Sequence, residues 1–355
     1  MNSNFLEILN IQSYSGKTER MAEYIFDKCL ERGYEVDYSE GNLYITKGIS
    51  PDGYYPCIVS HTDTVHDIIP DADYMVVHDD NIAMAYDIKN MTPTGIGGDD
   101  KVGIYIAMTM LETLDYCKAA FFRDEEIGCV GSSLADMSFF NDVRFVLQCD
   151  RKGNKDFVYN IFGTDLYGED FYTDISPIIE EYGYSESTGG LTDVYQLAEN
   201  GIGVAVANMS CGYYNPHCDD EMINLHDVEN CLNMVYSIMV NCTKVYTFDL
   251  PPKVTKSYGS SFNYSNGYGN GYSSGYGKSF GSGYGGYADD WYGTYDKKDT
   301  NADLWDGWTY DGKKYSKTSS SVKAECWNCS IDFFESELSK DGLCSHCCGF
   351  HGSPF

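Results

Sequence analysis

Five clusters of acidic and histidine residues stand out in the first two thirds of the chain, because such side chains are common ligands of catalytic metal ions. They are His61 with Asp63, Asp99 in the stretch GIGGDDK, Glu125 with Glu126, Asp150, and His217. Two metal ions about 3.5 to 4 Å apart can activate a water molecule and polarise a carbonyl group, as amide hydrolysis near neutral pH requires. The combination predicts a two-metal hydrolase.

The segments around these clusters indicate how the fold would position them. Three clusters directly follow short apolar runs that we expect to be strands, at residues 57–60, 119–122 and 143–147. Asp99 precedes apolar residues at helical spacing, which are Val102, Ile106, Met110 and Leu114. Open α/β sheets place their ligand-binding groups at the carboxyl ends of strands and at helix starts, so we expect the clusters to meet there.

The remaining pattern alternates helices with short strands. Further helices are expected over residues 17–31, 191–199 and 228–241, the last capped by Asp227, and further strands over 34–37, 42–46, 157–162 and 203–207. The sequence therefore predicts an α/β fold over residues 1–250, a three-layer αβα domain with a mixed, mostly parallel sheet.

Each cluster suits a different role in a two-metal site. Asp99 is the candidate bridging ligand, because a short carboxylate after two glycines lets both ions approach. His61, Asp99 and Asp150 would hold one ion, and His217, Asp99 and Glu126 the other. Asp63 lies two residues beyond His61 and would accept the second imidazole N–H. One glutamate of the pair can ligate while its neighbour moves the proton of the attacking water.

Taken one at a time, the clusters have simpler explanations. Asp99 alone could be a helix N-cap, His61 an ordinary loop histidine, and the two glutamates a solvated charge run. Only their combination at the ends of neighbouring elements favours a metal site.

The C-terminal third has a different composition. Residues 257–287 contain only Gly, Ser, Tyr, Asn and Phe apart from Lys278, so residues 251–320 are expected to form a disordered Gly/Tyr/Ser-rich and then acidic-aromatic linker. Residues 321–355 carry two CxxC pairs, Cys326, Cys329, Cys344 and Cys347, which predict a small zinc-ribbon-like module around one structural zinc ion. His346 and Cys348 are alternative ligands, and a redox cluster is the alternative interpretation.

Composition excludes several classes of function. A formal net charge of −30 makes binding to nucleic acid or to an anionic membrane unfavourable. The chain lacks an apolar run of membrane-spanning length and a signal-peptide pattern at its start, so we expect a cytoplasmic protein. Nine cysteines between Cys29 and Cys242 are expected to be buried free thiols. The tail or the ribbon remains a candidate site for a protein partner.

The motifs HTD, GGDDK, RDEE and CD, followed by a late histidine, occur in the order that resembles the dizinc peptidase family containing peptidase T and carboxypeptidase G. The stretches IQSYSGKTERMAEYI, GNLYITKG and GGLTDV extend the resemblance over about residues 5–245. It implies two catalytic zinc ions, with cobalt or manganese as alternatives, and Glu125 as general base. An aspartate at position 150 accompanies aminopeptidases of that family.

The sequence departs from the family between Asp150 and His217, where a whole lid domain is usual. The interval is filled by expected strands and helices of the catalytic domain, so the lid is predicted to be missing. Lid residues that contact the substrate would then need replacements. Candidates for substrate binding are Arg151, Asp193, Tyr213 and Tyr214.

The leading hypothesis is a zinc-dependent aminopeptidase acting on small peptides. One alternative is a deacylase or carboxypeptidase that acts on N-acyl amino acids. The other is a peptidase-like scaffold that binds partners without catalysis. A scaffold has no need of a general base, and the presence of Glu125 therefore favours an enzyme.

The C-terminal cysteines can be tested through metal content. Replacing Cys326 by Ser should remove one zinc ion per chain, because it takes one of four thiolates from the predicted site. Elemental analysis of the purified full chain measures this directly. Unchanged zinc content in the Cys326→Ser variant would contradict the structural zinc site.

Overall fold

The computed structural model describes residues 1–250 continuously and four short strands beyond them. These strands pair antiparallel, β15 (Trp308–Tyr310) with β16 (Tyr315–Lys317) and β17 (Lys323–Glu325) with β18 (Asp332–Phe334). The remainder of the predicted linker, and all four predicted zinc-binding cysteines, Cys326, Cys329, Cys344 and Cys347, lie outside the described residues. The linker and the zinc module therefore remain predictions.

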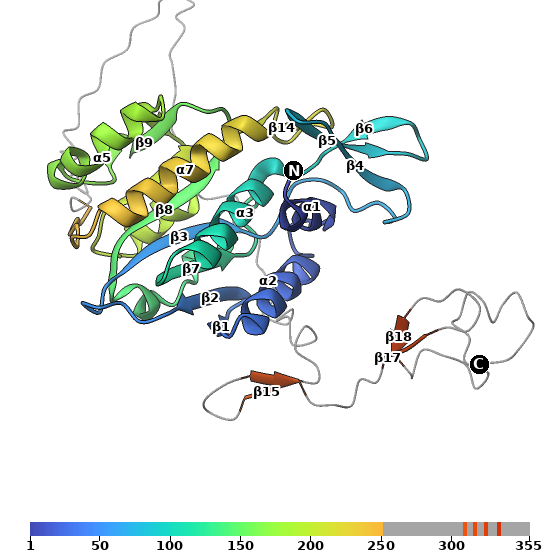
Figure 1. The fold of residues 1–355 in the computed structure, drawn as a ribbon, viewed down its shortest axis with the longest axis horizontal. Coiled ribbons are helices and arrows are strands. Elements are labelled where there is room, and N and C mark those ends of the chain that lie inside the picture. Colours follow the sequence, from blue (N-terminus) through green and yellow to red (C-terminus); the bar gives the residue numbers. More distant parts are fainter. Residues whose placement is uncertain (251–307, 311–314, 318–322, 326–331, 335–355) are drawn as a thin grey trace, which may run out of the picture. The chain divides into compact units, whose positions relative to one another are not determined.

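A nine-stranded mixed sheet forms the centre of residues 1–250 (Figure 1). Its strands run in the order β1 (Glu35–Ser39), β2 (Asn42–Lys47), β7 (Cys117–Phe122), β3 (Tyr55–His61), β8 (Val143–Arg151), β12 (Val206–Ser210), β9 (Asp156–Ile161) and β10 (Thr164–Asp165), and β11 (Ser185–Gly189) also pairs with β9. The expected strands are all present, with bounds that differ by a few residues.

The four central strands β7, β3, β8 and β12 are parallel to one another. Each of them consists mostly of buried residues, as expected of strands that are covered on both faces. Antiparallel neighbours flank this centre on both sides. The predicted mixed, mostly parallel sheet is therefore confirmed.

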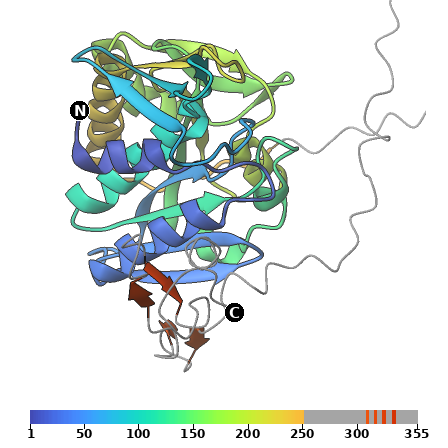
Figure 2. The same ribbon diagram turned by 90° about the vertical axis from the view of Figure 1, so that its right-hand side faces the viewer.

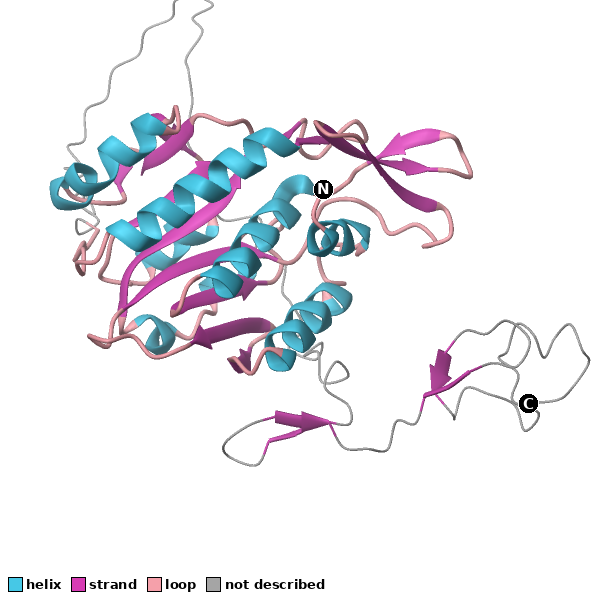
Figure 3. Cartoon of the chain, viewed as in Figure 1, coloured by secondary structure: helices cyan, strands magenta, loops and turns pink. Residues whose placement is uncertain are grey.

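Helices cover both faces of the sheet. On one face α2 (Glu19–Glu31), α3 (Gly98–Thr113) and α7 (Leu225–Asn241) lie side by side, with α1 (Ser3–Asn10) against α3 and α5 (Glu169–Glu181) against α7 (Figures 1 and 3). The other face carries the short helices α4 (Val130–Ser133) and α6 (Asp193–Glu199), which contact each other. A 3-10 turn spans Met137–Phe140. This is the expected three-layer arrangement.

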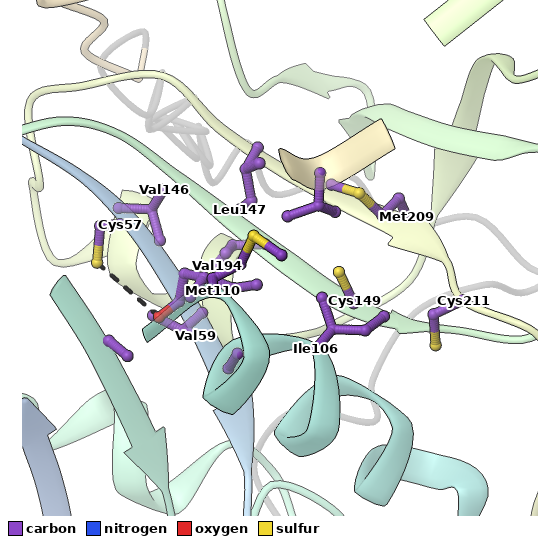
Figure 4. Packing of buried hydrophobic residues seen from close by; sticks show 14 of the residues in the cluster. Cys57, Val59, Ile106, Met110, Val146, Leu147, Cys149, Val194, Met209 and Cys211 are labelled. Carbon is purple, nitrogen blue, oxygen red and sulfur yellow. Dashed lines mark hydrogen bonds between the residues drawn. The ribbon is translucent and has the colours of Figure 1, made fainter. Parts of the chain in front are cut away.

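Helix α3 packs directly onto the middle of the sheet. Its side chains Ile106 and Met110 lie beside Val59 of β3 and Leu147 of β8 (Figure 4), and all four are fully buried. The helical spacing of apolar residues after Asp99 correctly predicted this helix. Because α3 is fixed against two central strands, the residues that open it are held above the carboxyl ends of those strands.

A second, five-stranded sheet stands at one end of the main domain and faces the viewer in Figure 2. It consists of β4 (Tyr74–His78), β5 (Ile82–Asp87), β6 (Thr92–Thr94), β13 (Tyr213–Tyr214) and β14 (Met222–Asn224). No strand was expected between residues 62 and 94, so β4, β5 and β6 are additions to the predicted fold. The signal was present, since YMVV and IAMAY flank the turn sequence HDDN as in a β-hairpin.

No inserted lid domain occurs between Asp150 and His217 within the described chain. Strands β9, β10, β11 and β12 of that interval all join the main sheet, and helices α5 and α6 pack with it. The two residues of β13 join the small sheet. The predicted absence of the lid is confirmed, because elements of the main domain fill the interval.

Two local predictions were wrong. Helix α5 was not expected, because Pro177 and several acids obscured the spacing of its buried Phe171, Ile175 and Ile179. The N-cap of α7 is Asn224, whose side chain accepts from the backbone N–H groups of His226 and Asp227. Asp227 therefore lies inside the first turn, where a carboxylate is still favourable to the helix dipole.

Eight of the nine cysteines between Cys29 and Cys242 are buried free thiols, as predicted, and Cys218 is exposed. Cys218 differs because it lies in the turn after His217, outside the sheet and helices. Among the described residues, none of the helices combines the length and the apolar composition that a membrane span would need.

Lys101 of the GIGGDDK stretch is an unusual buried cation in the first turn of α3. Its Nζ donates to the backbone oxygens of Leu9 at 3.2 Å and Ile96 at 2.8 Å. Burial lowers the pKa of Lys101 from its ordinary value of 10.5 to about 7. The lysine thus ties α1 and the approach to Asp99 together through its hydrogen bonds, at the cost of a buried charge.

Replacing Lys101 by Met removes this titration. Because the folded-state pKa lies below that of the unfolded chain, the folded state disfavours the proton. The free energy of unfolding of the wild type, relative to that of the Lys101→Met variant, should therefore rise between about pH 7 and pH 10. Denaturant titrations of both proteins across this range give the difference, and a pH-independent difference would contradict the assignment.

Candidate active site

The carboxyl ends of three neighbouring parallel strands bring three of the predicted clusters together. His61 is the last residue of β3, Glu125 and Glu126 follow β7, and Asp150 is the next-to-last residue of β8. Because β7, β3 and β8 are adjacent and parallel, these side chains share one edge of the sheet. His217 arrives from the loop between β13 and β14, beyond β12.

Asp99 lies between the two histidines. Its Oδ1 is 3.2 Å from His61 Nε2, and its Oδ2 is 3.3 Å from His217 Nε2. Asp99 is 9% exposed and has φ −83° and ψ 99°, so it is extended backbone just before the regular helix and not an N-cap. Each oxygen of the Asp99 carboxylate therefore faces a different histidine, as expected of a ligand shared by two metal ions.

Each histidine also faces a second carboxylate. His61 Nε2 is 3.6 Å from Asp150 Oδ1, and His217 Nε2 is 3.0 Å from Glu126 Oε2. The two groups of three are thus the ones expected from the sequence, sharing Asp99. His61, Asp99 and Glu126 also bring ligand atoms within 4.8 Å of one another, so the two groups form one continuous cluster.

The electrostatics of this cluster favour cations. Burial opposes protonation of His61, but contacts with Asp150, Asp63 and Asp99 outweigh it and raise its pKa well above the ordinary value. Hydrogen bonds to Asp99 and Glu126 raise the pKa of His217 to about 10. The surrounding carboxylates thus stabilise positive charge at both imidazoles.

One buried oxygen supports metal binding in particular. Glu126 Oε1 has no hydrogen-bond partner within the part of the chain that the structure describes. An unpaired buried carboxylate oxygen costs free energy unless a ligand satisfies it. Hard oxygen and imidazole nitrogen donors around such an atom fit a zinc-like divalent cation, so the residues present fit the metals expected from the sequence.

Asp100 also lies in the cluster, where its carboxylate oxygens are close to His61 and Asp150. Both of its oxygens are already occupied by protein donors. Oδ1 accepts from the backbone N–H of Gly103 at 3.1 Å, and Oδ2 accepts from Ser60 Oγ at 2.5 Å and from the backbone N–H of His61 at 3.2 Å. We therefore assign Asp100 to the support of the helix start and not to the ligand set.

Asp63 holds His61 in place. Its Oδ1 is 3.3 Å from His61 Nδ1, and its backbone oxygen lies 3.0 Å from the same nitrogen. Asp63 also accepts from Ser15 Oγ at 2.7 Å and from the backbone N–H of Glu125 at 2.9 Å. Burial raises the pKa of Asp63, but the bonds from His61 and Ser15 outweigh it and lower the pKa. An ionised Asp63 thus fixes both the imidazole and the Glu125 loop.

Glu125 stands beside the cluster without contacting either histidine. Desolvation by burial raises its pKa well above the ordinary value, and the neighbouring charge of Asp150 adds to the effect. The only described side-chain partner of its carboxylate is Cys129 Sγ, 3.3 Å from Oε1. A carboxylate with a raised pKa and free coordination capacity suits a proton acceptor and donor.

Residues that the sequence patterns did not identify hold Asp150. Its Oδ2 accepts from Gln148 Nε2 at 3.1 Å. Thr192 Oγ1 lies 3.1 Å from the same Oδ2 and 2.7 Å from Gln148 Oε1, so its single proton is shared between these two acceptors. Desolvation, with repulsion from Asp99, raises the pKa of Asp150 to about 8. Gln148 is a polar residue within the otherwise apolar strand β8, which is the one signal that could have found it. Thr192 lies in the stretch GGLTDV and has no such signal.

The four predicted substrate-binding residues occupy different places. Tyr213 is buried and its hydroxyl lies 3.3 Å from Asp150 Oδ1, inside the site. Tyr214 donates to Asp227 at 2.7 Å, and Arg151 pairs with Asp156 at 2.7 Å, so both are engaged away from the cluster.

Asp193 is fully buried, where it accepts from Ser132 Oγ at 2.5 Å. Desolvation raises its pKa to about 7. Gln148 Nε2, which donates to Asp150, also donates to Asp193 Oδ2 at 3.3 Å, so Asp193 supports the residue that holds Asp150. A direct role in substrate binding remains a prediction for all four residues.

The glycines before Asp99 let the loop pass close to neighbouring side chains. A Cβ on Gly95 would lie 2.0 Å from the ring of His66, and one on Gly98 would lie 2.7 Å from Tyr213 Cβ. Gly97 has φ +71° and would meet Thr64 at 2.8 Å. The glycines thus allow the loop to approach neighbouring side chains, and the expectation that they also let metal ions approach Asp99 stays a prediction.

Comparison with known proteins places the fold. No protein-family model matches the chain, and no curated protein matches it. Many solved structures are similar to it in fold, among them three peptidases. Aminopeptidase PepT from Bacillus cereus has a TM-score of 0.57 and 15% identity, with 68% of this chain and 97% of that chain covered.

The other two structures give similar values. A tripeptidase from Staphylococcus aureus has a TM-score of 0.52 and 15% identity, covering 66% of this chain and 95% of that one. Aminopeptidase APDkam598 from the archaeon Desulfurococcus kamchatkensis has a TM-score of 0.54 and 13% identity, covering 66% and 94%. At such identities the likeness shows the fold alone. The α/β fold implied by the sequence motifs is therefore confirmed as the fold of these peptidases.

Proposed function

We propose that this protein is a zinc-dependent exopeptidase that hydrolyses small peptides, with an aminopeptidase as the preferred form. The observation that carries the proposal is the position of Asp99, whose two oxygens face two different imidazoles at 3.2 and 3.3 Å. One carboxylate shared by two His-containing ligand sets is the arrangement required to hold two ions close together.

The ligand sets are His61, Asp99 and Asp150 for one ion and His217, Asp99 and Glu126 for the other. Three protein ligands per ion leave further positions for water and substrate, as catalytic zinc sites require. When bound, the two ions would supply an acidified water and a polarised substrate carbonyl. The unpaired Glu126 Oε1 and the raised pKa values of both histidines support cation binding here.

Glu125 is proposed as the general base. It would take a proton from the attacking water as the oxygen bonds to the carbonyl carbon, and it would then deliver that proton to the leaving amine nitrogen as the carbon–nitrogen bond breaks. Its freedom from the histidines and its raised pKa support both halves of this transfer. Asp63 contributes by fixing the Glu125 backbone and the His61 ring together.

The aminopeptidase form rests on two lines of support. The solved structures of similar fold include one named as an aminopeptidase and one named as a tripeptidase. Asp150, an aspartate and not a glutamate, matches the aminopeptidases of the family that the motifs resemble. Neither line separates peptides from N-acyl amino acids by geometry, so substrate comparison is the deciding experiment.

Replacing Asp99 by Ala should remove both catalytic ions, because it takes one ligand from each set at once. We expect about two fewer equivalents of zinc per chain than in the wild type, measured by elemental analysis after dialysis. The Cys326→Ser variant serves as a control that should keep both. Full metal content in the Asp99→Ala protein would contradict the shared site.

Replacing Glu125 by Gln should leave metal binding intact and lower the rate of hydrolysis by about 100-fold or more, because the proton acceptor is lost. Steady-state rates are measured on a panel of unblocked di- and tripeptides and on their N-acetylated counterparts, with and without chelator. Preference for the unblocked members identifies an aminopeptidase, and preference for the acetylated ones a deacylase or carboxypeptidase.

The control is Glu23→Gln, a glutamate on the exposed side of α2 that is remote from the cluster. Its rates should equal those of the wild type. If the metal-loaded wild type hydrolyses no member of either panel, the binding-scaffold alternative is favoured instead.

A further inference from the structure

Glu221 is a fully buried glutamate that the proposed chemistry does not use. Its Oε1 accepts from the backbone N–H of Asp99 at 3.1 Å, and its Oε2 accepts from the backbone N–H of Gly97 at 2.7 Å. The same Oε2 lies 2.9 Å from His66 Nε2. Both oxygens of the carboxylate are thus taken up by protein donors, and two of these donors belong to the loop that carries the bridging ligand.

Three loops of the active site meet at this carboxylate. His66 belongs to the segment that leaves β3 after His61 and Asp63, and Gly97 with Asp99 form the approach to α3. Glu221 itself lies four residues beyond His217, in a turn closed by its backbone N–H bond to the oxygen of Cys218 at 3.0 Å. The segment from His217 to Glu221 therefore holds Asp99 at two points. The imidazole of His217 faces the Asp99 side chain, and the carboxylate of Glu221 accepts from the Asp99 backbone N–H.

The glycines of the GIGGDDK stretch fit this arrangement. A Cβ on Gly98 would lie 3.2 Å from Glu221 Oε1, and a Cβ on Gly95 would overlap the ring of His66. The loop therefore comes close to the Glu221–His66 pair only because these positions carry no side chain. This provides a reason for the glycines that is independent of any metal ion.

We infer that Glu221 is a positioning residue, which sets the place of Asp99 between the two histidines by binding the backbone on either side of Gly98, with His66 as its partner. The inference rests on the proposed function, in which Asp99 bridges two metal ions. A charged acceptor suits the role, because hydrogen bonds to an ionised carboxylate are stronger than those to a neutral group. The small sheet takes part through β14, which begins at the next residue.

The decisive variant is Glu221→Gln, which keeps the shape and replaces one oxygen by an NH₂ group. That group would face a backbone N–H at Gly97 or at Asp99, so one of the two loop bonds is lost. We expect the affinity for the more weakly held ion to fall about 10- to 100-fold, the range found when partners of metal ligands are removed. We expect kcat to fall by a similar factor with KM nearly unchanged, because the substrate contacts remain.

The measurements are made on the full chain loaded with cobalt in place of zinc. Chelator competition gives the metal affinity, and the visible absorption spectrum of bound cobalt reports the geometry of its ligands. Thermal unfolding of the metal-free proteins is recorded in parallel. A merely structural role would lower the unfolding temperature and leave the affinity and the cobalt spectrum as in the wild type, and this result would overturn the inference.

Two further variants complete the test. Asp219→Asn removes the same charge from an exposed neighbour in the same turn and should match the wild type in every measurement. His66→Asn removes the third donor to Glu221 and should weaken metal binding in the same direction by a smaller factor. If Glu221→Gln fails to fold, wild-type metal affinity in His66→Asn overturns the inference, and weakened affinity with an altered spectrum supports it.

Failure of the inference can be told from failure of the proposed function. A wild type that binds two cobalt ions and hydrolyses peptides, beside a Glu221→Gln variant with the same affinity and kcat, refutes only the positioning role. A wild type that binds no metal refutes the two-metal site and with it the inference.

Discussion

The site depends on the repulsion among carboxylates that the fold places together out of water. Asp99, Asp150, Glu125 and Glu126 lie at one edge of the sheet, largely buried, and desolvation is the first cause of the raised pKa values of the last three. Such a concentration of negative charge is stable only if cations or protons compensate it. The two histidines take part of that role, and in the proposed function metal ions take the rest.

The main sheet makes this concentration unavoidable. Adjacent parallel strands end at the same edge, so residues that end β7, β3 and β8 must be neighbours whatever their charge. Helix α3 adds Asp99 from above, because its apolar face is fixed against the same strands. Burial of apolar side chains in the core, such as Ile106 and Met110, stabilises the fold and thereby offsets the repulsion among the carboxylates of the site.

Buried hydrogen bonds then set the orientation of each functional group. Asp63 joins the His61 ring to the Glu125 backbone, Gln148 and Thr192 hold Asp150, and Glu221 holds the backbone at Asp99. Asp63, Thr192 and Glu221 come from three different loops and Gln148 from strand β8, so the orientation of the site depends on several parts of the fold at once. The small sheet takes part in this network because His217 and Glu221 both lie between its strands β13 and β14.

The sequence by itself determined the chemical types and the strand ends: which residues carry imidazole and carboxylate, and which apolar runs precede them. Local periodicity is enough for this, because the spacing of apolar residues along the chain indicates which face of a strand or helix is buried.

Only the tertiary structure decided which oxygen of Asp99 faces which histidine. It also decided that the Asp100 carboxylate accepts hydrogen bonds from Ser60 and Gly103. The close approach of His66 and Tyr213 to the glycines of GIGGDDK is likewise visible only in the fold. These contacts join residues far apart in the chain, and their partners are set by strand order and loop approach. Glu221 was missed for the same reason: nothing beside it in the sequence indicates that its carboxylate binds a backbone more than a hundred residues away.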